Sequence, residues 1–183
     1  MDRIEYGKIN DSFKRTLVFH LGCDAGFFSE FNNMVLAMLY CQRNEIRFVL
    51  YSDDANFKIG RGWEDFFMPF CDESRKAGHH RLNRRPPPGQ IPLKSRLTIA
   101  VFKRIYGIDH LTHDVWNDFR NREFAGQSFS FLGHSDLDLR SAAQILISML
   151  WNYNPETRCA IETLKNSVPL PEEYLGLNIR SGD

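Results

Sequence analysis

The first third of the chain contains two short apolar runs on either side of one long apolar segment. Residues 16–20 and 46–51 are β-branched and aromatic runs bounded by turn residues, which predicts two strands. Between them, residues 27–43 are rich in helix formers and contain no glycine or proline, which predicts a helix with Ser29 as its N-cap. Every position from 34 to 41 is apolar or aromatic, so we expect this helix to be buried. This order of elements predicts a parallel, right-handed βαβ unit.

The middle of the chain has a weaker pattern. Residues 72–90 are charged and contain three consecutive prolines, which predicts an extended surface loop. Leu97, Val101 and Ile105 then follow helical spacing, and Gly107 stands where a C-terminal cap belongs. A single helix is therefore predicted before Gly107.

Helical patterns dominate the last third. Residues 135–138 open a helix in the manner of a capping box, with Asp in the place of the usual Glu or Gln. Pro155 then starts a second helix, because proline is favoured at a first helical position. Its predicted inner face carries Ala160, Ile161 and Leu164.

A final strand is predicted over residues 174–179, and only a polar turn follows it. We therefore expect an α/β fold with a parallel, Rossmann-like sheet flanked by helices. Residues 1–172 are assigned to one α/β domain. Residues 173–183 are assigned to the first strand and binding motif of a second domain that is missing or truncated.

Composition narrows the class of protein. Apolar residues make up 43% of the 183 residues, and Lys plus Arg equals Asp plus Glu at 23 each. This balance excludes a disordered chain and argues against a dedicated nucleic-acid binder. No apolar stretch is long enough to span a membrane, so no membrane span is predicted. The four cysteines form no Cys-x-x-Cys pair; free thiols in a reducing compartment are expected, with a secreted disulfide left open.

Two segments carry candidate chemistry, because ligands of open α/β sheets collect at the carboxyl ends of strands. The loop over residues 22–29 precedes the long helix, whose free N–H groups can receive a phosphate. Residues 180–183 follow the last predicted strand, and Arg180 can direct two donors onto a phosphate. A tight turn and a solvated polar terminus are the alternative interpretations of these two segments.

Taken together, three stretches resemble the N-terminal half of GDP-fucose-dependent fucosyltransferases, most closely the α1,6-fucosyltransferase group. The first stretch is the strand, glycine loop, apolar helix and strand over residues 17–52. The second is Gly62-Trp63-Glu64 with the aromatic segment behind it. The third runs over residues 150–183, and its ending, Leu-Gly-Leu-Asn-Ile-Arg-Ser-Gly-Asp, is similar to the family's His-x-Arg-x-(Gly/Thr)-Asp motif.

The resemblance implies the front half of a GT-B-like glycosyltransferase that transfers fucose from GDP-fucose to a glycan acceptor, with inversion and without a metal or other cofactor. It assigns Arg180 to the donor diphosphate and Asp183 to the close of the motif. Gly26 would lie in the loop beside the donor. Trp63 is a candidate sugar contact, with a packing role as the alternative. No catalytic residue is identified.

Several residues depart from the family pattern. Asn178 replaces the histidine of the motif, which keeps a hydrogen-bonding group at this donor-binding position without the charge. Ser181 replaces a second arginine, and Phe28 replaces a further glycine of the loop. The family's catalytic base and guanine pocket lie beyond the motif. We therefore expect the chain alone to bind donor weakly and to transfer nothing.

Two other functions compete with this one. A non-catalytic relative that binds a glycan or a protein would fit the lost arginine. A nucleic-acid contact through Arg81, Arg84 and Arg85 is disfavoured, because these residues lack interleaved aromatics. The chain is expected in the cytoplasm of a microbe or virus. A homodimer is left open, since half of a cleft exposes apolar surface.

Overall fold

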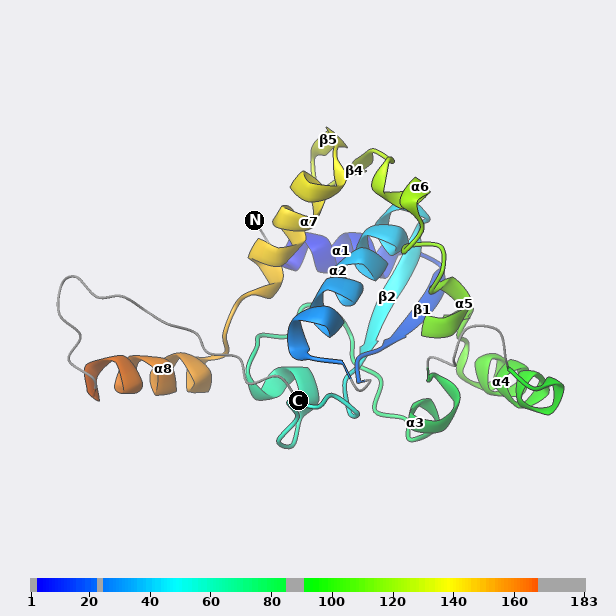
Figure 1. Ribbon diagram of the computed structural model, residues 1–183, viewed down its shortest axis with the longest axis horizontal. Helices are drawn as coiled ribbons and strands as arrows, with labels where there is room; N and C mark the ends of the chain where they lie inside the picture. Colours follow the sequence, from blue (N-terminus) through cyan, green and yellow to red (C-terminus); the bar gives the residue numbers. More distant parts are fainter. Residues whose placement is uncertain (1–2, 23–24, 85–90, 168–183) are drawn as a thin grey trace.

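The computed structural model describes residues 3–22, 25–84 and 91–167, and its centre is a three-stranded parallel sheet (Figure 1). The strands are β1 (Arg15–His20), β2 (Ile46–Tyr51) and β3 (His110–Leu111), in the order β2-β1-β3. All six residues of β1 pair in register with β2. The predicted parallel βαβ unit is therefore confirmed, and the fold is α/β with a sheet compatible with a Rossmann-like arrangement.

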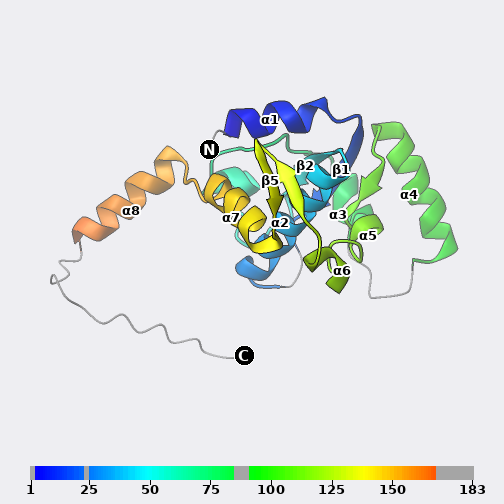
Figure 2. The same ribbon diagram turned by 90° about the horizontal axis from the view of Figure 1, so that it is seen from above.

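Helices cover both faces of this sheet. Helix α2 (Phe27–Arg43) covers one face, α7 (Leu139–Leu150) packs against α2, and α1 (Arg3–Ser12) lies along β2 (Figure 2). On the other face, Val18 forms a small apolar cluster with Phe102 of α4 (Leu93–Tyr106). On the α2 face, Phe19 and Phe48 form the main apolar cluster with Met38. Large rings fill much of this core, which accounts for the high phenylalanine content.

The long helix α2 has the predicted bounds and a different N-cap. Gly26, in extended backbone conformation, is the N-cap, and its carbonyl accepts from the N–H groups of Ser29 and Glu30. Ser29 therefore lies inside the first turn, and its prediction as the N-cap was wrong. The apolar run inside α2 is largely buried, with Met34 and Cys41 fully so, as its sequence predicted.

The predicted surface loop contains a short helix, α3 (Gly78–Leu82), which follows the short 3-10 helix η1 (Gly62–Asp65) along the chain. Helix α4 (Leu93–Tyr106) ends at Gly107 in the left-handed conformation, with φ of 63°, so the predicted C-cap is confirmed. Helices α5 (Thr112–Val115) and α6 (Arg122–Ala125) are single turns.

A two-stranded hairpin stands where the start of a helix was expected. Strands β4 (Phe129–Phe131) and β5 (His134–Leu137) are antiparallel, and their two-residue turn places Leu132 and Gly133 at positive φ. Helix α7 begins only after β5. Asp138 is its N-cap and accepts from the N–H of Ser141 at 2.7 Å.

Helix α8 (Pro155–Ser167) starts at the predicted proline and projects away from the rest of the described chain (Figure 1). None of its residues is buried; Ala160 and Leu164 are exposed, so the predicted inner face was wrong. The predicted strand over residues 174–179 and the boundary at residue 173 lie outside the described residues. Within the described ranges, no helix is long and apolar enough to cross a membrane.

Candidate functional site

The carboxyl ends of β1 and β2 meet at one edge of the sheet, and a polar network gathers there. His20 is the last residue of β1, and Asp54 lies three residues beyond the end of β2. His20 Nε2 and Asp54 Oδ2 are 2.7 Å apart, and the His20 side chain is buried. This is the edge at which open α/β sheets bind ligands.

Asp54 joins two histidines. Its second oxygen, Oδ1, lies 2.7 Å from Nδ1 of His80, whose side chain is 58% exposed. Arg84 lies behind His80, with a guanidinium nitrogen 3.0 Å from its Nε2. Because arginine only donates, Nε2 of His80 accepts and its Nδ1–H donates to Asp54. The order Arg84, His80, Asp54, His20 therefore fixes the hydrogen positions along this chain of contacts.

The environment keeps Asp54 ionised at neutral pH. Partial burial alone would raise its pKa, but the hydrogen bonds from His20 and His80 outweigh burial and lower the pKa below its ordinary value of 3.8. His80 is the exposed side chain of this network, so it is the group through which this edge can contact a ligand.

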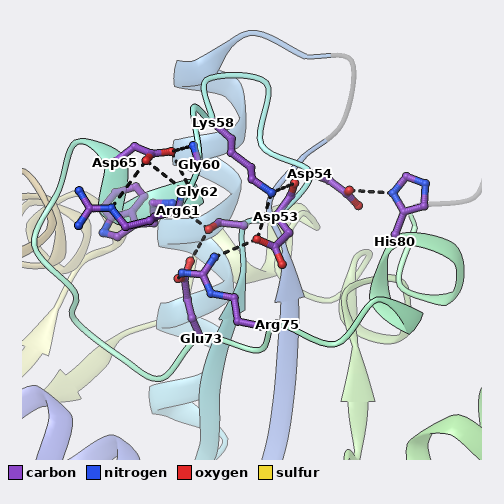
Figure 3. Close-up of polar contacts among 12 residues, drawn as sticks. Asp53, Asp54, Lys58, Gly60, Arg61, Gly62, Asp65, Glu73, Arg75 and His80 are labelled. Atoms are coloured by element: carbon purple, nitrogen blue, oxygen red, sulfur yellow. Dashed lines mark hydrogen bonds and ion pairs between the residues drawn. The ribbon is translucent and has the colours of Figure 1, made fainter.

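A second cluster is centred on Arg75, beside the first (Figure 3). The Arg75 guanidinium lies 2.9 Å from Asp53 Oδ1 and also pairs with Glu73. Lys58 contacts the same oxygen of Asp53 at 3.3 Å. Burial raises the pKa of Glu73, although its hydrogen bond from Ser52 and the Arg75 charge oppose the rise. The two cations are thus engaged by carboxylates of the chain.

The loop before η1 folds around an internal carboxylate. Asp65 accepts from the backbone N–H groups of four consecutive residues, which are Ile59, Gly60, Arg61 and Gly62. Burial opposes ionisation, but these four bonds outweigh it and lower the Asp65 pKa to about 2. Asp65 therefore fills a ring of N–H groups that would otherwise bind an external anion.

Glycines let this loop and the loop after β1 approach the end of β2 closely. Gly22 has φ of 143°, and a Cβ there would lie 2.3 Å from the Asp54 carbonyl oxygen. Gly62 has φ of 72°, and a Cβ there would lie 2.0 Å from Oγ of Ser52. Only glycine fits both the conformation and the space at these positions.

The predicted donor loop lies at the same edge. Glu30, in the first turn of α2, accepts from the Gly22 N–H at 3.1 Å and holds the loop against the helix. Gly26 is exposed, and a Cβ there would meet no atom within 4 Å. The N-terminus of α2 therefore opens toward solvent at Gly26, beside the end of β1.

The other predicted site residues fare differently. Trp63 is 1% exposed, its ring stacks on Phe67 at 4.4 Å, and its indole N–H donates to the Met68 carbonyl. In this structure Trp63 packs in the core. Asn178, Arg180 and Asp183 lie outside the described residues, so their expected position beside Gly26 stays a prediction.

Sequence reasoning missed the histidine–aspartate network. No motif in the sequence pattern related His20 to Asp54 or to His80. The available signal was the position of His20 and Asp54 directly behind two strands that were expected to be parallel. Among residues 3–22, 25–84 and 91–167, no group of three or more His, Cys, Asp or Glu side chains could hold a metal ion.

Two surface hollows lie away from this edge. One, of about 220 Å³, is lined by Tyr40 and Asp118, and another, of about 430 Å³, by Gln42 and Phe129. Both are next to the C-terminal end of α2, opposite to Gly26. Comparison of the chain with family models, with curated proteins and with solved structures gave no match.

Proposed function

We propose that this chain is the donor-side α/β portion of a GDP-fucose-dependent glycosyltransferase with a GT-B-like architecture. Its substrates are the GDP-sugar and a glycan acceptor, and transfer proceeds with inversion and without a metal. The observation that carries this proposal is the open N-terminus of α2 at Gly26, at the carboxyl edge of a parallel βαβ unit. Helix N-termini at this edge stabilise phosphate through free N–H groups and the helix dipole.

The motif at the end of the chain completes the proposed donor site. Arg180 pairs with the diphosphate, and Asp183 orients the guanidinium or accepts from a sugar hydroxyl. Asn178 contributes an uncharged hydrogen bond. A preorganised guanidinium stabilises the negative charge that develops on a departing nucleoside diphosphate. The resemblance supports these roles.

One observation favours a second function, that of a non-catalytic relative that binds a glycan or a protein. Arg75 and Lys58 are both paired with Asp53, so these two cations are not free for a diphosphate. A neutral sugar surface would fit such a network better than a charged one. Loss of the second motif arginine at residue 181 points the same way.

Calorimetric titration of the 183-residue chain with GDP-fucose separates the two functions. If the chain is part of a glycosyltransferase, we expect it to bind GDP-fucose weakly. Arg180→Ala should then reduce the affinity at least tenfold, because a bidentate arginine–phosphate pair is lost. Arg140→Ala, an exposed arginine on α7, is the matched control and should bind as the unchanged chain does. A heat of binding for UDP-glucose equal to that for GDP-fucose would contradict a GDP-fucose site. An unchanged affinity of Arg180→Ala for GDP-fucose would contradict it too.

A second pair of variants tests the contact of the diphosphate with the loop that contains Gly26. Gly26→Ala adds a methyl group into open space at the proposed diphosphate contact and should weaken GDP-fucose binding several-fold. Gly7→Ala, within α1, also adds a methyl group into open space and should leave binding unchanged. Equal affinity in both variants would remove the α2 N-terminus from the donor site.

A further inference from the structure

The charge of this neutral chain is strongly divided along the sequence. Residues 74–108 contain nine of its 23 Lys and Arg residues and none of its 23 Asp and Glu residues. The remaining residues therefore carry a matching excess of negative charge. A basic segment of this kind in an otherwise acidic chain is typical of contact with a polyanion.

Helix α4 lies in the middle of this segment and has two apolar faces. Its inner face carries Phe102, which is buried in a small cluster with Val18 and Leu111, and Ile99 packs against the same cluster. Its outer face carries Leu97, Val101 and Ile105 at successive four-residue intervals, and these side chains are 66%, 57% and 68% exposed. The inner face anchors the helix, so the outer stripe is held toward solvent.

Basic side chains accompany the outer stripe. Lys94 and Arg104 lie on the same side of α4 as Leu97 and Val101 by helical periodicity, and neither forms an ion pair within the described part of the chain. The other cations of α4 are engaged: Lys103 lies 3.0 Å from Asp114, and Arg96 donates to the Ile91 carbonyl. The outer face therefore combines three aliphatic side chains with two positive charges that no carboxylate of the described residues pairs with.

Both views place α4 at the outer edge of the described chain, next to α3 (Figures 1 and 2). The helix has 14 residues and is about 21 Å long, so it can lie along a flat surface but cannot cross a bilayer. Arg81 and Arg84 lie on the α3 side and line a hollow of about 160 Å³ with Ser95 and Ile99 of α4. This hollow lies on the inner side of α4, because Ile99 packs against the inner cluster, and it is separate from the outer stripe.

We propose that the outer face of α4 binds the surface of an anionic phospholipid bilayer, with the helix in the plane of the interface. Leu97, Val101 and Ile105 insert between the headgroups, and Lys94 and Arg104 contact lipid phosphates. A basic amphipathic helix with an exposed aliphatic stripe binds such surfaces through apolar burial and electrostatic attraction. This inference is independent of the proposed glycosyltransferase activity.

The charge and the side-chain types of the outer face of α4 favour an anionic bilayer over a second copy of the chain and over a nucleic acid. A symmetric dimer through α4 would bring the same basic helices of two copies together, and like charges would repel. A nucleic acid would satisfy the cations but leave the aliphatic stripe in water, because base stacking requires aromatic or guanidinium planes. An anionic bilayer supplies negative charge and an apolar layer together.

The test is cosedimentation of the full 183-residue chain with large vesicles of phosphatidylcholine containing 30% phosphatidylserine. We expect binding that falls in high salt and is absent with vesicles of phosphatidylcholine alone. The double variant Lys94→Gln/Arg104→Gln should lower the partition coefficient roughly 30-fold. Each replacement removes one positive charge near the membrane surface, and each such charge contributes about 1 kcal/mol to binding. Lys8→Gln/Arg140→Gln removes one exposed Lys and one exposed Arg elsewhere and is the matched control.

A second pair of variants tests the apolar stripe. Val101→Asp should lower binding at least tenfold, whereas Leu164→Asp, at a 69% exposed position on α8, should lower it less than threefold. Both positions are exposed, so both variants should keep the circular dichroism of the unchanged chain. Equal binding to neutral vesicles, or equal losses in variant and control, would overturn the membrane surface. Binding of oligonucleotides without binding of vesicles, or a dimer that Val101→Asp dissociates, would also overturn it.

Discussion

Nε2 of His20 lies 2.7 Å from Oδ2 of Asp54, and this contact joins the last residue of β1 to the loop that follows β2. It holds the two loops at the carboxyl edge of the sheet in one arrangement. The same carboxylate positions the exposed His80. Stability of this edge and its capacity to meet a ligand therefore depend on one side chain.

Replacement of Asp54 should destabilise the fold. In Asp54→Asn, the amide can accept from only one histidine, and a charge-assisted bond to buried His20 or to His80 is lost. We expect the free energy of unfolding to fall by about 2 kcal/mol, measured by urea denaturation with tryptophan fluorescence. Because the pKa of Asp54 is lowered in the folded chain, this stabilisation is present above pH 3.8 and declines as the pH falls below it.

Asp11→Asn is the control for that measurement. Asp11 pairs with Arg47 at 3.1 Å, but its side chain is 58% exposed, so its loss should cost less than about 0.5 kcal/mol. Equal destabilisation by the two variants would mean that the His20–Asp54 contact adds nothing beyond a surface ion pair.

Glycine at residue 22 should be essential and glycine at residue 26 dispensable for stability. Gly22→Ala places a Cβ against the Asp54 carbonyl at positive φ, and we expect a loss of about 3 kcal/mol. Gly26→Ala meets open space and removes only part of an N-cap preference, which costs less than about 1 kcal/mol. Thermal denaturation of both variants tests the difference, and similar melting temperatures would refute the close approach of the two loops.

Asp65 should contribute stability that disappears in acid. Its pKa is about 2 in the folded chain and near 3.8 in the unfolded chain, so the unfolded chain binds more protons in this interval. The contribution is complete above pH 4 and is lost as the pH falls toward 2. We expect Asp65→Asn to unfold about 2 kcal/mol more easily at pH 7 and to differ little from the unchanged chain at pH 2. A constant difference over this range would show that the carboxylate charge is irrelevant.

His79 should remain neutral in the folded chain well below its ordinary pKa. It is buried beside Tyr51 and Phe102; burial, followed by the charges of His20 and Lys76, lowers its pKa to about 4. The unfolded chain therefore takes up a proton first, and stability declines as the pH falls from 6.5 to 4. We expect this residue to account for about 3 kcal/mol of that decline. An NMR titration of the imidazole checks this, and a midpoint near 6.5 would contradict it.

The βαβ unit could be predicted because its pattern is local. Two β-branched runs flank a long apolar helix, and the observed bounds of α2 and β2 match the predicted ranges. The cap at Gly107 was predictable for the same reason, since glycine favours the left-handed conformation that ends a helix. Local propensity and tertiary structure agree at these places.

Other features depended on contacts that sequence does not display. The β4–β5 hairpin was missed because Leu132 occupies a positive-φ turn position that usually takes Asn, Asp or Gly. The apolar residues of α8 follow helical spacing but have no covering element in the described chain. Asp54 lies next to His20 because Gly22 and Gly62 allow two loops that are distant in sequence to pack closely against the end of β2.

The most direct test of the proposed donor site is an NMR titration of the ¹⁵N-labelled chain with GDP-fucose. If the donor site lies at the carboxyl edge of the sheet, the amide signals of Gly22, Gly26 and Phe27 will shift together with increasing ligand, and the amide signal of His80 will shift as well. Signals at the opposite end of α2, such as Asn44, should stay in place. Shifts confined to that opposite end, or none at millimolar GDP-fucose, would contradict a donor site at the carboxyl edge of the sheet.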